Sequence, residues 1–462
     1  MLHTPQAPGE APERHDRPAK RAEYEAFMAA HPGLAAVELL IVDPNGVLRG
    51  KWAPADALGK AYAEGVNFPL SIHGLDVWGR EVPATGLHIE SGDRDGFFCA
   101  VPGSLAPVPW AERDTAQVLL RTFDAAGRPF AGDARNALVR SVERLAAMGL
   151  AASVAFELEF FLVETDPDTG AISPVDDAAG PDRQLMYGVD PLHERAALID
   201  DIRAFADAQG LPIDTIVKEA APGQFEVNLR HRADALAAAD DVIRLRRLVA
   251  AAARRHGLTA SFMAKPFIEA AGNGMHVHVS LLDQNGANVF ADPAEGEARL
   301  RGAVAELLST MEEALIVFIN TWNGFRRLQP GSYAPTRAVW GENNRSVALR
   351  IPACGPANRR IEHRIAGADA NPYLVLAAIL AAMAEGLQAR RPPPPPVEGN
   401  AYDDDGARLP ADMAVALDAF RSSAFVRRAL GAELAAIVGH VKDAEIAAFR
   451  REISPLERAS YL

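Results

Sequence analysis

The segment AFELEFFLV (Ala155–Val163) is apolar apart from two glutamates, and this limits how it can fold. In a β-strand, successive side chains point to opposite faces, so Glu157 and Glu159 share one face and the apolar residues beside them take the other. The two carboxylates then lie about 7 Å apart along the strand. Because burying an unpaired carboxylate is costly, that face must be solvated or must lie against positive charge.

Three further strand-like segments, QFEVNL, GMHVHVSL and RRIEHRI, also alternate polar and apolar residues. Another glutamate stands in KEAAPGQ, before a Pro-Gly turn that leads back to QFEVNL. A polar face turned to solvent is the ordinary explanation of any one segment. Solvent faces usually include lysine, however, whereas these faces carry acids, histidines and arginines. The polar positions are Glu219; Glu226 and Asn228; His276, His278 and Ser280; and Arg360, Glu362 and Arg364.

If these faces converge, five glutamates and a histidine surround one space, and so much negative charge requires divalent cations. Oxygen-rich ligand sets with one imidazole favour Mg²⁺ or Mn²⁺ over zinc. Five carboxylates are too many for one ion, so we expect at least two ions in the site. Arg345 and Arg350, in NNRSVALRIP, suggest a phosphate held between metals and guanidinium groups. The combination indicates ATP-dependent phosphoryl chemistry.

The common nucleotide-binding motifs are absent. No GxxxxGK[ST] occurs, and GNGMHV lacks the third glycine of a dinucleotide fingerprint and leads into a strand. The formal net charge of −14 argues against nucleic acid or an anionic membrane as the main partner. The two cysteines stand far apart, in no CxxC pattern, which fits a reducing cytosol and a cytoplasmic protein.

Changes in composition and pattern along the chain predict its domains. Residues 1–30 mix proline with both charge signs, so we expect a disordered leader. Residues 31–129 begin with a strand–turn–strand pattern around DPNG and stay rich in Gly and Pro, which indicates a small β-rich domain. Residues 130–462 alternate strands with amphipathic helices, one of them starting at Asp190, and indicate an α+β domain. The apolar run Tyr373–Ala384 is too short to span a bilayer and predicts a buried helix.

The segments FELEFFL, KEAAPGQFE, GNGMHVHVSL, NRSVALRIP and RRIEHRIAGADANPYL resemble, in order and spacing, the signature segments of the glutamine synthetase superfamily, over about residues 35–462. The resemblance implies a β-grasp domain over 31–129 and a catalytic domain over 130–462, whose curved antiparallel sheet forms a half-barrel flanked by helices. It also implies a homo-oligomeric ring, commonly a dodecamer in bacteria, with active sites between subunits. The implied chemistry has two steps: the γ-carboxylate of glutamate takes the γ-phosphoryl group of ATP, and an amine then displaces phosphate.

The resemblance also implies roles for individual residues, which fall into metal, nucleotide and substrate groups. The resemblance implies that one metal is bound by Glu159, Glu219 and Glu226, and that a second metal, beside the ATP phosphates, is bound by Glu157, His276 and Glu362. It implies that ATP is bound by His278, Ser280, Arg350 and Arg360, and that the transferred phosphoryl group is contacted by Arg345. It implies that glutamate is bound by Arg327, Arg364 and Gly272.

Two departures from the family pattern concern the amine. Where ammonia-using members have an Asp in F-D-G-S-S, the aligned FPLSI has Pro69. Where their flap loop reads Y-E-A-P, this chain has SYAP (Ser332–Pro335, the flap loop), with Tyr333 in place of the Glu. Losing two carboxylates weakens the attraction for a small cation and leaves room for a larger nucleophile. NFPLSIHGLDVWG and GFFCAVPGSLAPVPW also resemble the γ-glutamylpolyamine synthetase branch, so we expect putrescine or another polyamine.

Several alternatives stay open. The enzyme could use ammonia, or a monoamine such as ethanolamine, or it could transfer phosphate to a guanidino nitrogen. A ring scaffold without activity is disfavoured because the full set of metal-type ligands is present. The distal ammonium of a diamine would need an acid or an aromatic cage, for which we consider Asp76, Trp78, Glu342 and Tyr187. We expect Tyr402 to be an ordinary exposed tyrosine, and His231 and His363 to be structural or surface residues.

Overall fold

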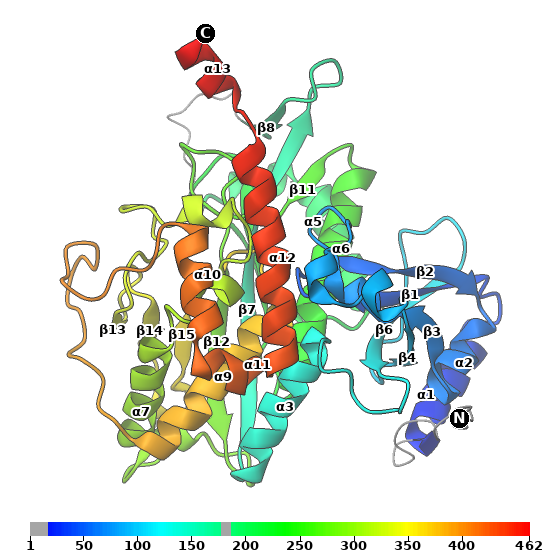
Figure 1. Ribbon diagram of the computed structural model, residues 1–462, viewed down its shortest axis with the longest axis horizontal. Helices are drawn as coiled ribbons and strands as arrows, with labels where there is room; N and C mark the ends of the chain where they lie inside the picture. The colour runs from blue at the N-terminus through cyan, green and yellow to red at the C-terminus, as the bar shows by residue number, and fades with distance from the viewer. Residues whose placement is uncertain (1–16, 177–185) are drawn as a thin grey trace, which may run out of the picture.

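The computed structural model describes residues 17–176 and 186–462, which form two β-sheets with helices packed against them (Figure 1). The smaller sheet belongs to the N-terminal part of the chain and lies to the right in Figure 1. The larger sheet runs through the middle of the remaining chain, with the long helix α12 (Ala432–Arg451) drawn in front of it.

The smaller sheet has the strand order β2-β1-β6-β4-β3, with β5 beside β6. β1 and β2 are antiparallel and joined by a turn at Asp43–Gly46, as predicted, with Gly46 at φ 80°. β1 also pairs in parallel with β6. Its core contains Val37, Phe98 and Val118, all buried. The elements are β1 (Ala36–Val42), β2 (Leu48–Pro54), α2 (Ala57–Ala63), β3 (Val66–Pro69), β4 (Asp95–Ala100), β5 (Ala106–Pro107) and β6 (Thr115–Phe123).

The expected disordered leader is wrong for its second half, because residues 17–30 form helix α1 (Arg17–Ala30). Tyr24, Phe27 and Met28 pack against the core of the smaller sheet. This tertiary packing stabilises a helix that the mixed charges and proline of the leader did not suggest. Residues 1–16 lie outside the described residues.

The larger sheet has nine strands in the order β13-β14-β15-β12-β7-β10-β9, with β8 and β11 also paired to β7. Its pairings are antiparallel except between β13 and β14, which are parallel. The curved sheet and its helices confirm the predicted α+β catalytic architecture. The strands are β7 (Ala151–Thr165), β8 (Ile172–Pro174), β9 (Ile213–Lys218), β10 (Gln224–Leu229), β11 (Thr259–Ser261), β12 (Met275–Leu282), β13 (Trp340–Glu342), β14 (Leu349–Ile351) and β15 (Ile361–His363).

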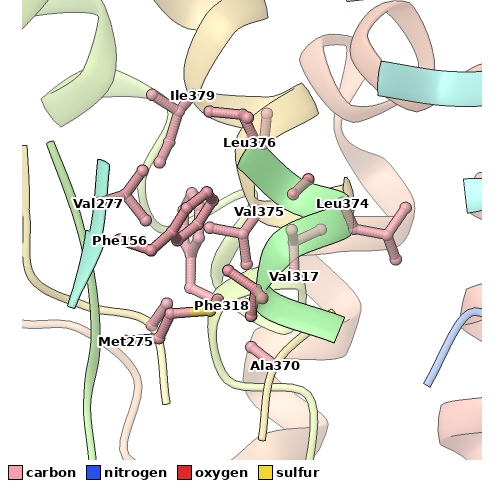
Figure 2. Close-up of a cluster of buried hydrophobic side chains, with 14 of the residues drawn as sticks. Phe156, Met275, Val277, Val317, Phe318, Ala370, Leu374, Val375, Leu376 and Ile379 are labelled. Carbon is pink, nitrogen blue, oxygen red and sulfur yellow. The ribbon is translucent and has the colours of Figure 1, made fainter. Parts of the chain in front are cut away.

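Helix α9 (Pro372–Ala389) covers the apolar face of the larger sheet and confirms the predicted buried helix. Figure 2 shows Phe156 and Val277 of the sheet facing Val375 of α9 and Phe318 of α8 (Leu315–Phe318). Among the described residues, α9 is the one helix whose length and hydropathy would suit a membrane span, and 78% of its 18-residue window is buried inside the molecule. The apolar face of β7 is therefore buried in the core, and the glutamates of β7 lie on the opposite face.

Several described helices begin at a residue whose side chain caps the first turn. Asp133 caps α3 by accepting backbone hydrogen bonds from Arg135 and Asn136, and Asp234 caps α6. The helix predicted to run on from Asp190 is interrupted at Arg195, whose guanidinium pairs with Asp176 at 2.5 Å. The remaining helices are α3 (Ala134–Ala147), α4 (Asp190–Glu194), α5 (Ala196–Ala208), α6 (Ala235–Arg255), α7 (Gly296–Ser309), α10 (Met413–Ser422), α11 (Ala424–Leu430) and α13 (Pro455–Tyr461).

Candidate active site

The strand register brings the polar faces together around β7. On one side of β7, Glu226 of β10 stands opposite Glu159. On the other side, His276 of β12 stands opposite Glu157, and His278 stands opposite Glu362 of β15. The predicted convergence of the polar faces is therefore confirmed, and it follows from pairing between segments as far apart in the chain as Glu157 and His276.

All of these residues except Glu362 line a cavity of about 740 Å³, here called the acid-lined cavity. The acids enter it from β7, β10 and the turn after β9, and arginines enter it from β14 and from the segments that flank β15. Carboxylates and guanidinium groups thus line one space, and the two sets are here called the carboxylate wall and the arginine wall. Its charged and histidine lining consists of Glu157, Glu159, Glu219, Glu226, His276, His278, Arg327, Arg345, Arg350, Arg360 and Arg364.

A second cavity of about 770 Å³ adjoins the first. Both are lined by Glu157, His278 and Arg360, so the two spaces meet at these side chains. Ser280, predicted on the nucleotide side, lines the second cavity, and its hydroxyl donates to the Arg359 carbonyl at 3.0 Å. Arg350, predicted beside it, lines the acid-lined cavity instead.

The acids and histidines form three overlapping groups. Within each group, the ligand atoms lie within 4.8 Å of one another. One group contains the three residues predicted for the first metal. The residues predicted for the second metal do not form one group. His278, rather than His276, joins Glu157 and Glu362, because His278 stands opposite Glu362 in the strand register. Oxygen donors with one imidazole suit Mg²⁺ or Mn²⁺, so the donor chemistry fits the expected ions. The groups are Glu159, Glu219 and Glu226; Glu157, His278 and Glu362; and Glu157, Glu226 and His276.

The electrostatics of the acid cluster favour cation binding. Burial, together with the charge of Glu219, raises the pKa of Glu159 to about 7. Burial and three neighbouring glutamates raise the pKa of Glu226 to about 9. Without a cation, Glu226 is protonated at neutral pH and Glu159 is about half protonated, because burial and mutual repulsion disfavour the charged forms. A divalent cation would displace those protons and relieve the repulsion.

The histidines hold Glu157 between them. Its carboxylate lies 2.8 Å from Nε2 of His278 and 3.4 Å from Nδ1 of His276. Burial alone would raise the pKa of Glu157, but these hydrogen bonds hold it well below its usual range. Burial lowers the pKa of His276 to about 4, so its imidazole is neutral, which is the form that binds a metal.

On the arginine wall, Glu362 orients two guanidinium groups. Arg350 donates to it at 2.6 Å, and Arg364 also donates to it. Burial alone would raise the pKa of Glu362, but Arg364 and the histidines lower it to about 2. The buried Nε atoms of Arg350 and Arg364 have no hydrogen-bond partner within the described part of the chain. Because unpaired buried donors are costly, these two point to an anionic ligand in the cavity.

The predicted glutamate-binding residues form a tightly packed corner of the acid-lined cavity. Arg327 is buried, and its guanidinium donates to the Ile365 carbonyl at 2.8 Å. A Cβ at Gly272 would lie 2.6 Å from the Ala264 carbonyl oxygen and 2.8 Å from Cγ of Arg327, so only glycine fits. The N–H of Gly274 donates to Glu159 at 2.6 Å and joins this corner to the acid wall.

Residues 131–461 match the family described as the catalytic domain of glutamine synthetase. The chain belongs to the glutamine synthetase family. γ-Glutamylputrescine synthetase PuuA of Escherichia coli (strain K12) is 40% identical over 441 residues, which cover 94% of this chain and 93% of that protein. Glutamate–isopropylamine ligase of a Pseudomonas species is 32% identical over 450 residues, which cover 94% of this chain and 96% of that protein. A solved GmaS/ADP complex has a TM-score of 0.82 at 29% identity and covers 94% of this chain and 98% of that chain. The predicted resemblance, with its polyamine branch, is confirmed.

This glutamine synthetase family member carries two tyrosines at the rim of the acid-lined cavity. Tyr333 of the flap loop and Tyr187 both line it, and both are more than half exposed. Both also have left-handed backbones, with φ 57° and 60°, which is uncommon for a bulky side chain. The Tyr187 N–H donates to the Lys218 carbonyl at 3.0 Å, next to Glu219. Two exposed aromatic side chains therefore line the same cavity as the carboxylates.

The other residues considered for the amine lie elsewhere in this family member. Asp76 is buried, and its carboxylate accepts the backbone N–H groups of Trp78 and Arg80 at 3.0 and 2.8 Å. Trp78 packs against Phe449 with ring centroids 5.4 Å apart. Glu342 lines a different cavity, of about 640 Å³, together with Arg345. Asp76 is thus engaged by its own turn, which sequence spacing alone did not indicate.

Three minor expectations are settled by the structure. Tyr402 is not an ordinary exposed residue, because it is partly buried and its hydroxyl donates to the Ala334 carbonyl at 3.1 Å. His231 is exposed, as expected, but it lines the second cavity, as does Cys354, for which we predicted no role. His363 is buried against Phe318 at 4.4 Å between ring centroids and is structural. The surroundings of Tyr402, His231 and Cys354 depend on tertiary contacts, which the sequence alone does not reveal.

Proposed function

We propose that this chain is an ATP-dependent ligase that joins the γ-carboxylate of glutamate to an organic amine, with putrescine or another polyamine favoured. The observation that carries the proposal is one cavity lined by both the carboxylate wall and the arginine wall, with a second cavity meeting it at Glu157. Such an arrangement suits two substrates, one that brings phosphates from one side and one that brings a carboxylate from the other. The named amine ligases at 40% and 32% identity support the same reaction class.

In this proposal, ATP occupies the second cavity and directs its γ-phosphate toward Glu157. Glu159, Glu219 and Glu226 would hold one Mg²⁺ or Mn²⁺, and Glu157 with Glu362 and the two histidines would hold another. When bound, these ions neutralise charge on the phosphates and polarise them toward attack. The acids supply the ligands, and their backbone-fixed register keeps the two positions a few ångströms apart.

The residues of the arginine wall bind the reactants and stabilise the charge that develops in phosphoryl transfer. Arg327 and Arg364 bind glutamate, so that an oxygen of its γ-carboxylate attacks the γ-phosphorus of ATP and ADP leaves. Arg345, exposed at the cavity rim, contacts the transferred group and stabilises its developing charge. The amine nitrogen then attacks the carbonyl carbon of the γ-glutamyl phosphate, and phosphate leaves.

The open rim supports an alkylamine rather than ammonia. Tyr333 and Tyr187 present aromatic faces on which an alkylammonium chain can lie. Pro69, where ammonia-using members have an acid, lines a hollow of about 420 Å³ on the smaller sheet. In the proposed homo-oligomeric ring, a dodecamer in the cytoplasm, such a surface from one subunit would complete the site of the next.

The test is ADP release by the full chain with glutamate and Mg²⁺ across ammonia, ethanolamine, putrescine, spermidine and spermine. We expect release to require glutamate and to show the highest kcat/KM with putrescine or a longer polyamine. A highest value with ammonia would contradict our interpretation of Pro69 and Tyr333. Intact rings with no turnover of any amine would indicate the scaffold instead.

A further inference from the structure

A segment far from the flap loop in sequence runs beside it in the structure. This segment, residues 397–409, follows the polyproline run and is here called the strap. Its residues Ala407 and Leu409 exchange backbone hydrogen bonds with Ala338 and Thr336, at 2.9 and 3.0 Å. At its start, Val397 donates to the Trp340 carbonyl at 2.8 Å. The strap therefore pairs with the chain that immediately follows the flap loop.

Two consecutive residues of the strap contact two different parts of the site. The N–H of Ala401 donates to the Ser346 hydroxyl oxygen at 3.0 Å, and Ser346 directly follows Arg345. The Tyr402 hydroxyl donates to the Ala334 carbonyl at 3.1 Å, in the flap loop beside Tyr333. One point of the strap thus links the phosphoryl-contacting arginine to the flap loop.

We propose that Tyr402 is a positioning residue that holds the flap loop closed over the γ-glutamyl phosphate, at a fixed spacing from Arg345. The inference rests on the proposed function and adds to it how the site excludes water.

The flap loop needs such an external contact because its own conformation is strained. Tyr333 has a positive φ of 57°, which a bulky side chain seldom adopts, whereas Gly331 takes its φ of 79° without strain. Within the loop, Ser332 donates to the Gln329 carbonyl at 2.6 Å, and the Ala334 N–H reaches Ser332 only at 3.3 Å. Burial raises the pKa of Tyr402, so its hydroxyl stays protonated and remains a donor at neutral pH. A left-handed tyrosine persists only where its surroundings hold it.

Water exclusion matters because an acyl phosphate is open to hydrolysis. If the flap loop opens before the amine arrives, the oxygen of a water molecule attacks the γ-carbonyl carbon. Phosphate then leaves, glutamate is regenerated, and ATP has been hydrolysed without ligation. A closed loop prevents this side reaction. Loss of the Tyr402 hydroxyl should therefore raise ADP release that does not require an amine.

The experiment compares Tyr402→Phe with Tyr461→Phe, a matched loss of a hydroxyl in the exposed C-terminal helix. Two quantities are measured on the full chain: the ratio of amine-independent to amine-dependent ADP release, and hydrogen–deuterium exchange of the peptide that contains the flap loop. For Tyr402→Phe we expect the ratio to rise about five- to tenfold, the change that corresponds to one net hydrogen bond. Exchange in the flap loop should rise with it, and the Tyr461→Phe variant should match the wild type in both.

An unchanged ratio and unchanged exchange in Tyr402→Phe, with an active wild type, would overturn the positioning role. A uniform loss of both activities with unchanged flap exchange would also overturn it, since that pattern indicates general damage. A wild type without glutamate-dependent ADP release would contradict the proposed function instead. In that case the exchange measurement still decides whether Tyr402 holds the flap loop.

Discussion

Glu226 and Glu159 are direct partners across adjacent antiparallel strands, so two carboxylates that repel each other are fixed on one face of the sheet. The apolar residues that alternate with them are buried in the core, which prevents either strand from turning its acid away. The protein therefore maintains an unfavourable charge arrangement that only protons or cations relieve. This arrangement has measurable consequences for stability and for metal binding.

The metal-free protein should lose stability as the pH rises. The pKa of Glu159 is raised to about 7 and that of Glu226 to about 9, so the folded chain binds these protons more tightly than the unfolded chain does. Stability from a raised carboxyl pKa is present at low pH and is lost as the pH rises through the folded value. We expect Tm in EDTA to fall between pH 6 and pH 9, and saturating Mg²⁺ to reduce the fall. A metal-free Tm that rises over this range would contradict the account.

Glu226→Gln should separate stability from metal binding. The amide keeps the shape but cannot ionise, so folding at pH 8 no longer has to protonate and bury this carboxyl group, and Tm in EDTA should rise by a few degrees at most. The same change removes a ligand shared by two of the three groups, so the Tm increase caused by Mn²⁺ should shrink. Glu164→Gln, on the exposed end of the neighbouring strand β7, is the control and should change neither value. A Tm in EDTA below that of the wild type would show that the repulsion is not present.

The facial arrangement of this site could be predicted from sequence, because strand alternation follows directly from the apolar positions. Glu157 and Glu159 share a face since the residues between them must be buried. The register could not be predicted, because it depends on pairing between distant segments. For that reason the opposition of Glu362 to His278 rather than to His276, and the shared position of Glu157 in two groups, appear only in the structure.

Irregular segments were the least predictable part of the fold. Tyr402 lies in a strap with little periodicity, and its contact with Ala334 arises from chain that has no helix or strand of its own. Helix α1 packs against the smaller sheet, and Arg195, where the helix that follows Asp190 is interrupted, pairs with Asp176. Local propensity carries no signal for contacts of this kind.

Arg345→Ala should impair chemistry without disturbing the metal sites. The side chain is exposed, so its removal leaves no cavity in the core. We expect ADP release with glutamate and putrescine to fall by about 10² to 10³ in kcat, the range for loss of one group that stabilises transition-state charge. Mn²⁺ binding should stay within twofold of the wild type. Arg326→Ala is the control, since Arg326 is also exposed and should leave the rate unchanged. A fall of less than tenfold in Arg345→Ala would remove this residue from the mechanism.

Tyr333→Glu should shift the enzyme toward ammonia. The substitution places a carboxylate on the flap loop, at the rim where Tyr333 now stands 64% exposed. A carboxylate there attracts a small cation, and the alkyl chain of a polyamine loses an aromatic surface. We expect the ratio of kcat/KM for ammonia to that for putrescine to rise about tenfold or more. Tyr333→Phe keeps the ring and should keep the preference of the wild type. If both variants behave alike, the flap loop does not select the amine.

The most direct test of the account is the number of Mn²⁺ ions bound per chain, measured by calorimetric titration of the wild type, Glu219→Gln and Glu157→Gln. Glu219 belongs to one group of ligands, whereas Glu157 belongs to the other two. We predict at least two ions for the wild type, loss of one ion in Glu219→Gln, and loss of the other in Glu157→Gln. A single ion in the wild type, or loss of all ions in Glu219→Gln, would contradict a two-metal site built on the paired glutamates of β7.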